Sequence, residues 1–144
     1  MTIREAIDRT DAVKPNSYST EEKVRWLAIL DGMVKNEIID THEGGELVVF
    51  VPYTASTLVN TVLLIAEPYA QEVYPAWLAA QIDFANEEIP RYNNDMQAYN
   101  AAYDLYSDWY NRTHMPLQKN KTHTYISGYT EPTLPWPLQT ENDA

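Results

Sequence analysis

Five large side chains near the end of the chain recur at steps of three and four residues. They are Met96, Tyr99, Tyr103, Tyr106 and Tyr110. This spacing places all five on one face of a helix, so we predict a helix over about residues 95–114, with candidate caps at 93–95. An aromatic stripe at helical spacing is usually buried core rather than the lining of a ligand pocket. We therefore expect this aromatic seam to pack against a neighbour, with its hydroxyl groups reaching polar partners at the rim.

Three further segments carry the apolar period of a helix. They cover about residues 2–13, the stretch from Ser19 to before Gly44-Gly45, and about residues 69–89. The first ends at Pro15, because proline disfavours a helical conformation for the residue before it. The second opens with Ser19 and Glu22 at the spacing of a capping box, and Pro90 ends or kinks the third. The pattern predicts a mainly α protein, a small four-helix bundle in one domain.

Between the second and third helices the period changes. Residues 46–53 (ELVVFVPY) and 61–66 (TVLLIA) are short apolar runs rich in β-branched side chains, separated by several residues. Such a pair predicts a β-hairpin inserted at about residues 46–66, with Pro52 at an edge or a strand end. An isolated hairpin is only marginally stable in water. We therefore expect it to lie on the helices or on another copy of the protein.

The chain carries 21 acidic and 10 basic residues, a net charge of −11. Tight binding of a nucleic-acid backbone requires clustered Lys and Arg, and the nearest approach to a cluster is the pair Lys119 and Lys121. The absence of cysteine excludes disulfides and thiolate chemistry. No apolar run approaches the ~20 residues that span a membrane, and the charged N-terminus is unlike a signal peptide. The composition predicts a soluble cytosolic protein that repels DNA.

Two groups of polar residues are candidates for chemistry. A divalent metal would take Asp40, His42 and Glu43 as ligands, joined by His114 or His123. A pair of carboxylates for acid–base catalysis would come from Asp83, Glu87 and Glu88. The first group lies at a helix end beside Gly44-Gly45, where polar residues cap and solvate the chain, and adjacent glutamates on a helix point about 100° apart. We therefore assign no catalytic residue, no cofactor and no metal.

A series of short phrases follows in order along the chain. The phrases are IREAI (3–7), KPN with Tyr18 (14–18), EKVRWL (22–27), IIDTHEG (38–44), PY (68–69), AQIDFAN (80–86), RYNN (91–94) and WYNRTHMP (109–116). Together they resemble head–tail connector, or adaptor, proteins of tailed phages and of prophages of Gram-positive bacteria. The resemblance covers about residues 3–116 and leaves the middle apolar runs and the end of the chain less matched.

The resemblance implies a helical connector domain over residues 1–116. Beyond it the helical period fades, and the composition rich in proline and aromatic residues predicts an extended arm over residues 117–144. Proteins of this class assemble as a ring beneath the portal, extend the DNA channel and dock the tail or stopper proteins. They are not enzymes. The implied place is the neck of the virion, assembled in the cytoplasm of the bacterial host. DNA would pass through the ring without specific binding, and no membrane is involved.

The arm, rich in proline and aromatic residues, suits docking on another subunit. We expect contacts with other subunits from the predicted hairpin and the arm, because exposed aromatic anchors often carry most of an interface's energy. The candidate interface residues are Val49, Phe50, Tyr53, Tyr125, Tyr129 and Trp136. For each, packing within its own protomer is the alternative. An alternative function is a small acidic monomeric phage protein that binds and regulates a host or phage protein; a metal-dependent enzyme using His42 ranks below both.

Overall fold

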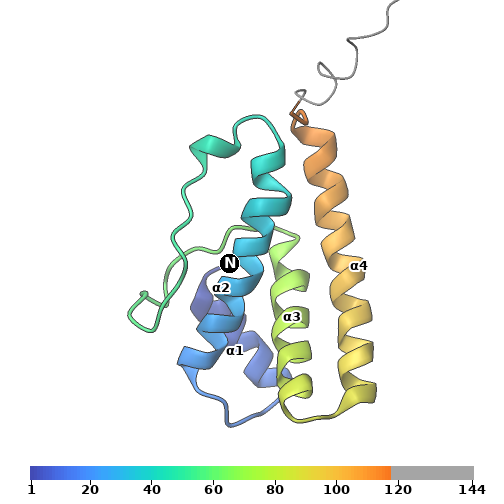
Figure 1. Ribbon diagram of the computed structural model, residues 1–144. Coiled ribbons are helices and arrows are strands. Elements are labelled where there is room, and N and C mark those ends of the chain that lie inside the picture. Colours follow the sequence, from blue (N-terminus) through green and yellow to red (C-terminus); the bar gives the residue numbers. More distant parts are fainter. Residues whose placement is uncertain (118–144) are drawn as a thin grey trace, which may run out of the picture.

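Four helices account for most of the computed structural model, which describes residues 1–117 (Figure 1). They are α1 (Ile3–Val13), α2 (Thr20–Glu37), α3 (Ala70–Ala85) and α4 (Ile89–Thr113). Two short 3₁₀ turns, η1 (Ile39–Thr41) and η2 (Gly45–Leu47), follow α2. The mainly helical class predicted from the sequence is confirmed.

The first two helices begin at side-chain caps. Thr2 and Glu5 form a reciprocal capping box at the start of α1. At α2, the Ser19 side chain accepts a hydrogen bond from the Glu22 amide, 3.1 Å away. The Glu22 carboxylate does not reach back to the cap but pairs with Arg25. The predicted capping box of α2 is therefore only half formed.

The boundary between α3 and α4 differs from the prediction. Helix α3 ends at Ala85. Glu87, two residues later, has a φ of 62°, which is incompatible with a right-handed helix and so separates α3 from α4. Pro90 does not end a helix but lies in the first turn of α4, where its missing amide costs no hydrogen bond. Residues 93–95, proposed as caps, are inside α4.

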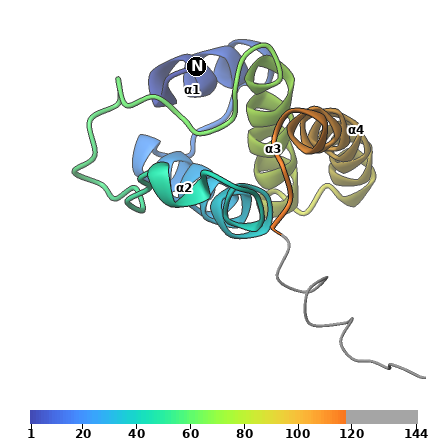
Figure 2. The same ribbon diagram turned by 90° about the horizontal axis from the view of Figure 1, so that it is seen from above.

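Helix α3 lies at the centre of the arrangement, antiparallel to α4 and in contact with α1 and α2 (Figures 1 and 2). The fully buried side chains include Leu27, Leu30, Val34, Tyr74, Leu78 and Ile82. The aromatic seam of α4 faces this core, with Tyr99, Tyr106 and Tyr110 buried and Met96 and Tyr103 packed against it. The core position predicted for the seam is confirmed.

The predicted β-hairpin does not form. Residues 48–69, called here the crossover, connect η2 to α3 and contain no strand (Figure 1). The second apolar run pairs with the N-terminus instead: Thr61 accepts from the Ile3 amide at 3.0 Å, and the Leu63 amide donates to Met1 at 2.9 Å. An isolated antiparallel bridge joins Thr2 and Val62. The first run therefore has no strand partner within residues 1–117.

The end of α4 is fastened to the turn after α2. The Glu43 amide donates to the Met115 carbonyl at 2.8 Å, and the Leu117 amide donates to the Thr41 carbonyl at 3.1 Å. This antiparallel pairing is called here the clasp. Residues 118–144, which carry all but the first residue of the predicted arm, lie outside the described part of the chain. No helix within residues 1–117 is long and apolar enough to cross a membrane.

Candidate interaction surface

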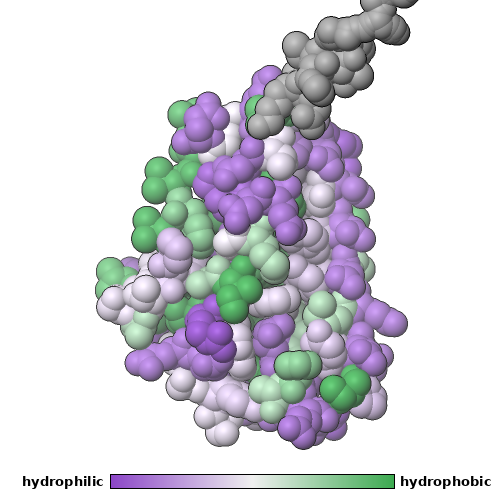
Figure 3. All heavy atoms as spheres, viewed as in Figure 1, coloured by the Kyte–Doolittle hydropathy of each residue, from purple (hydrophilic) through white to green (hydrophobic). Residues whose placement is uncertain are grey.

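A row of apolar side chains projects from η2 and the start of the crossover. Leu47, Val49 and Val51 are 80%, 83% and 72% exposed. The residues between them, Val48 and Phe50, are half-buried and face the helices. Green, hydrophobic side chains accordingly gather along the left margin of Figure 3, where Figure 1 places this segment. The alternation is that of an extended chain with one covered face and one open face.

The inward-facing residues rest on α2. An edge atom of the Phe50 ring lies 3.9 Å from where a Cβ of Gly32 would be. The ring also meets Tyr53 edge-on, with centroids 5.4 Å apart. The Tyr53 hydroxyl donates to the Asp31 carboxylate at 2.7 Å. The open face is therefore backed by a packed face, which fixes its position relative to the bundle.

Asp31 holds both halves of the crossover. Its carboxylate is fully buried and accepts from the Tyr53 hydroxyl, from the Leu64 amide at 3.0 Å and from the Tyr74 hydroxyl at 2.5 Å. Burial raises the pKa of Asp31, and the hydrogen bonds from Tyr74, Tyr53 and Leu64 oppose that rise. The Tyr74 hydroxyl in turn accepts from the Ile65 amide at 2.8 Å. One carboxylate on α2 thus organises a segment whose bonded residues lie 22 and 33 positions further along the chain.

The sequence reading missed Asp31. The signal was present, because this acidic residue lies among the buried positions of α2, four residues after Leu27. An acid in such a stripe needs buried donors. Its donors come from tyrosines and backbone amides distant in sequence, which the pattern alone does not identify.

A groove of about 270 Å³ separates the two halves of the crossover. One wall is formed by residues 49–53 and the other by Thr57, Thr61, Val62 and Leu64. The two runs expected to pair as strands are therefore the opposite walls of an open groove. Leu58 and Val62, on the second half, are 72% and 67% exposed.

The structure describes three of the six candidate interface residues, and these three differ in exposure. Val49 is open to a partner, whereas Phe50 and Tyr53 are half-buried against α2 within their own protomer. Tyr125, Tyr129 and Trp136 lie outside the described residues. The structure brings the first three together at the groove.

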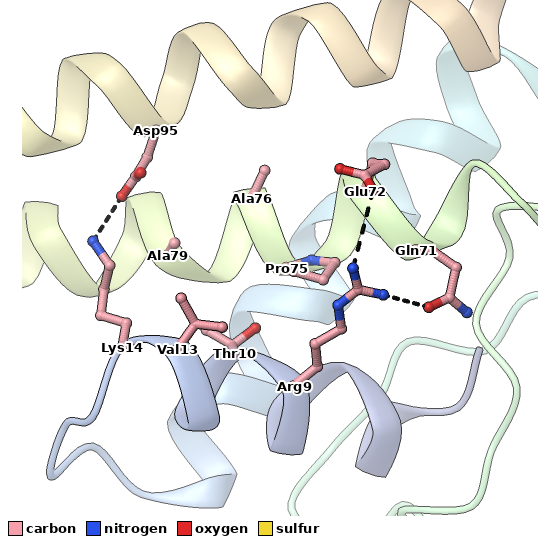
Figure 4. A pocket seen from close by; sticks show the side chains of 10 residues that line it. All are labelled: Arg9, Thr10, Val13, Lys14, Gln71, Glu72, Pro75, Ala76, Ala79 and Asp95. Carbon is pink, nitrogen blue, oxygen red and sulfur yellow. Dashed lines mark hydrogen bonds and ion pairs between the residues drawn. The ribbon is translucent and has the colours of Figure 1, made fainter.

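A second hollow, of about 260 Å³, lies between α1, α3 and α4 (Figure 4). Its cations are already paired: Lys14 bonds to Asp83 and, at 2.9 Å, to Asp95, while Arg9 bonds to Gln71 at 2.6 Å and lies 4.0 Å from the Glu72 carboxylate. Burial alone would lower the pKa of Lys14, but its hydrogen bonds to the two carboxylates raise it. These groups join three helices, so the hollow is a structural joint rather than a charged binding site.

The histidines take structural positions. His42 is buried, with Nδ1 2.6 Å from the Ile38 carbonyl and Nε2 2.7 Å from Oδ1 of Asn111. The His114 ring stacks on Tyr110, with centroids 3.8 Å apart. Asp40 pairs with Lys35. Within residues 1–117 no three His, Cys, Asp or Glu side chains are grouped to hold a metal ion, and His123 lies beyond that range.

Two of the three carboxylates considered for acid–base chemistry have separate cationic partners. Asp83 is buried against Lys14, and Glu88 pairs with Arg91 at 2.8 Å. Glu87 lies at the positive-φ position between α3 and α4.

A search of protein-family models, curated proteins and solved structures finds no match to this chain.

Proposed function

We propose that this chain is a structural head–tail connector, which forms a ring between the portal and the tail of a phage and extends the DNA channel. The resemblance of residues 3–116 to that class suggests the role. The observation that carries it is the exposed apolar row on a crossover held in place by Asp31. A surface of this kind, open yet fixed to a rigid bundle, suits contact with another protein.

The charge distribution supports passage of DNA without binding. Of the eight Lys and Arg residues within 1–117, seven lie in ion pairs with carboxylates, so few positive charges remain for phosphate. The excess of acidic groups repels a DNA backbone at short range. A channel wall of this character lets DNA slide rather than adhere.

Copurification with the portal protein of the same genome tests the proposal. The full chain should bind portal rings and add ring-shaped density beneath them in electron micrographs. Val49→Asp should weaken this binding about tenfold or more, because it places a charge on the contact surface. Val13→Asp is the matched control, since Val13 is 81% exposed on α1 and Val49 is 83% exposed on the crossover. Failure of the unaltered chain to bind the portal would refute the proposal.

The net charge favours one competing role, a monomeric regulator that covers a basic surface of a host or phage protein. Such a protein would remain monomeric at all concentrations and would bind its target more weakly as salt increases. The gene neighbourhood separates the two roles: portal and capsid genes next to this one would favour the connector over the regulator.

A further inference from the structure

The start of the crossover has the properties of an unpaired sheet edge. Within residues 1–117, the amides of Val49, Phe50, Val51 and Tyr53 donate no hydrogen bond to another residue. The outward side chains of this stretch are apolar, as described above. Exposed backbone donors beside apolar side chains are a template for an added strand.

The opposite wall of the groove has a second open edge. Thr61 and Leu63 use their backbone groups to bond the N-terminus. Val62 lies between them, and its amide has no partner in the described part of the chain. A strand seated in the groove would therefore meet unpaired backbone on both sides. It would supply the ladder that the two apolar runs do not form with each other.

The occupant must be an extended segment, and the chain has one of suitable composition outside residues 1–117. Residues 122–126 (THTYI) alternate β-branched and aromatic side chains, which favour strands. The 27 residues 118–144 reach roughly 90 Å when extended. By comparison, the 25 residues of α4 span only about 37 Å. The segment is therefore long enough to reach a neighbouring copy.

The clasp fixes the point from which this segment starts. Because Met115 pairs with Glu43 and Leu117 with Thr41, the chain at Leu117 runs back towards Asp40. The segment therefore begins at the corner after α2, where Leu117 is bonded to the backbone of Thr41.

Charge also favours the segment as the link between copies. It carries two lysines and three acidic residues, a net charge of −1, which leaves −10 on residues 1–117. Two bodies of that charge repel each other. Lys119 and Lys121 precede the THTYI stretch, so this part of the segment approaches an acidic body without electrostatic repulsion.

We propose that the C-terminal segment of one copy docks in the crossover groove of a second copy by strand addition, with the stretch around Tyr125 beside Val49. This inference deepens the proposed ring assembly and rests on it for the presence of a neighbouring copy. It assigns a surface to the aromatic residues of the arm.

Engineered cysteines test the contact directly, because the protein has none of its own. Full-length Val49→Cys and full-length Tyr125→Cys are purified separately, mixed and oxidised gently. A disulfide-linked dimer of one chain of each variant is expected. The matched control replaces Val49→Cys with Val13→Cys, which is similarly exposed but lies on α1. Its yield of linked dimer should be at least about tenfold lower.

Two further variants test strand addition. Ile126→Pro removes a backbone donor from the added strand and should weaken self-association about tenfold in sedimentation. Thr140→Pro, outside the THTYI stretch, should leave it unchanged. Equal linkage of Val13→Cys and Val49→Cys, or no linkage to either, overturns the proposal. So does an exclusively intramolecular bond in the double variant Val49→Cys/Tyr125→Cys, which would place the segment in its own groove.

The outcome is separable from that of the proposed function. Specific linkage without binding to the portal supports the inference and refutes the connector role. Binding to the portal without linkage supports the connector role and refutes the inference.

Discussion

At the scale of single residues, the least expected feature is a carboxylate in the centre of the apolar stripe of α2. Asp31 is fully buried, and within residues 1–117 it has hydrogen-bond donors rather than a cation around it. A buried charge of this kind is stable only while all of its partners are in place. Its contribution is therefore to select one path for the crossover.

Replacement of Asp31 by alanine should destabilise the protein by about 3 kcal/mol, because the buried Tyr74 hydroxyl, the half-buried Tyr53 hydroxyl and the Leu64 amide lose their acceptor. Asp31→Asn keeps one acceptor oxygen and should cost less. Urea unfolding followed by circular dichroism measures both. A loss below about 0.5 kcal/mol for the alanine variant would show that the hydrogen bonds are dispensable.

The raised pKa of Lys14 leads us to expect that the stability of the protein depends on pH in the alkaline range. Its pKa is raised from the ordinary 10.5, with burial opposing and hydrogen bonds to Asp83 and Asp95 causing the rise. A cation whose pKa is raised on folding stabilises the protein fully below the unfolded pKa. That stability is lost as pH rises through the folded value.

The variant Lys14→Gln should therefore be less stable than the natural protein at pH 8, and the difference should shrink above pH 10.5. Unfolding curves recorded from pH 8 upwards measure this. Arg4→Gln is the control, since Arg4 is exposed and makes only a 3.9 Å pair with Asp8. A difference in unfolding free energy between Lys14→Gln and the natural protein that stays constant with pH would contradict the raised pKa of Lys14.

At the scale of elements, the four helices follow from the sequence because apolar period and caps are local signals. The aromatic seam and the buried stripe of α2 both face the core as their spacing predicts. The hairpin could not be predicted correctly, because two β-branched runs do not specify which backbone each will pair with. The N-terminus takes the second run, and Asp31 draws the two halves towards α2 and α3.

The same limit applies to the candidate surface. Val49 could be identified as an exposed candidate from its run, but Tyr53 is directed inward by Asp31, which lies 22 residues earlier. Pro90 gave an ambiguous signal, since proline marks a helix end and a helix start equally well. Only the positive φ of Glu87 decides between them.

The corner after α2 supports a prediction on adjacent glycines. A Cβ at Gly45 would lie 2.2 Å from the Ile39 carbonyl oxygen, whereas a Cβ at Gly44 would meet nothing within 4 Å. Gly44 instead has a φ of 87°. Gly45→Ala should cost about 3 kcal/mol through steric overlap, and Gly44→Ala about 1 kcal/mol through backbone strain. Thermal unfolding of the two variants compares them, and the reverse order would contradict this geometry.

At the scale of the whole molecule, charge and exposed apolar surface oppose each other. The body repels its own copies, while the row Leu47, Val49 and Val51 favours their association. Salt weakens the first effect within roughly a Debye length and leaves the second in place. For the ring assembly that we propose, the balance between monomer and assembly would therefore be adjustable by ionic strength.

Self-association should accordingly strengthen as salt is raised from low to physiological concentration and beyond. Sedimentation velocity at constant protein concentration measures the shift. Leu47→Ser/Val51→Ser should remove most of the association without altering the unfolding curve, because both residues are exposed. Association that weakens with salt would indicate an interface held by opposite charges instead.

The clasp has a mechanical consequence. The chain from Met115 to Leu117 runs along the segment 41–43, to which it is bonded, rather than perpendicular to it. Tension on the C-terminal end therefore loads the backbone hydrogen bonds of Thr41 and Glu43 together, in shear, instead of opening them one at a time. A pull arriving through that end is shared between the ends of α2 and α4, so the bundle resists it as one body.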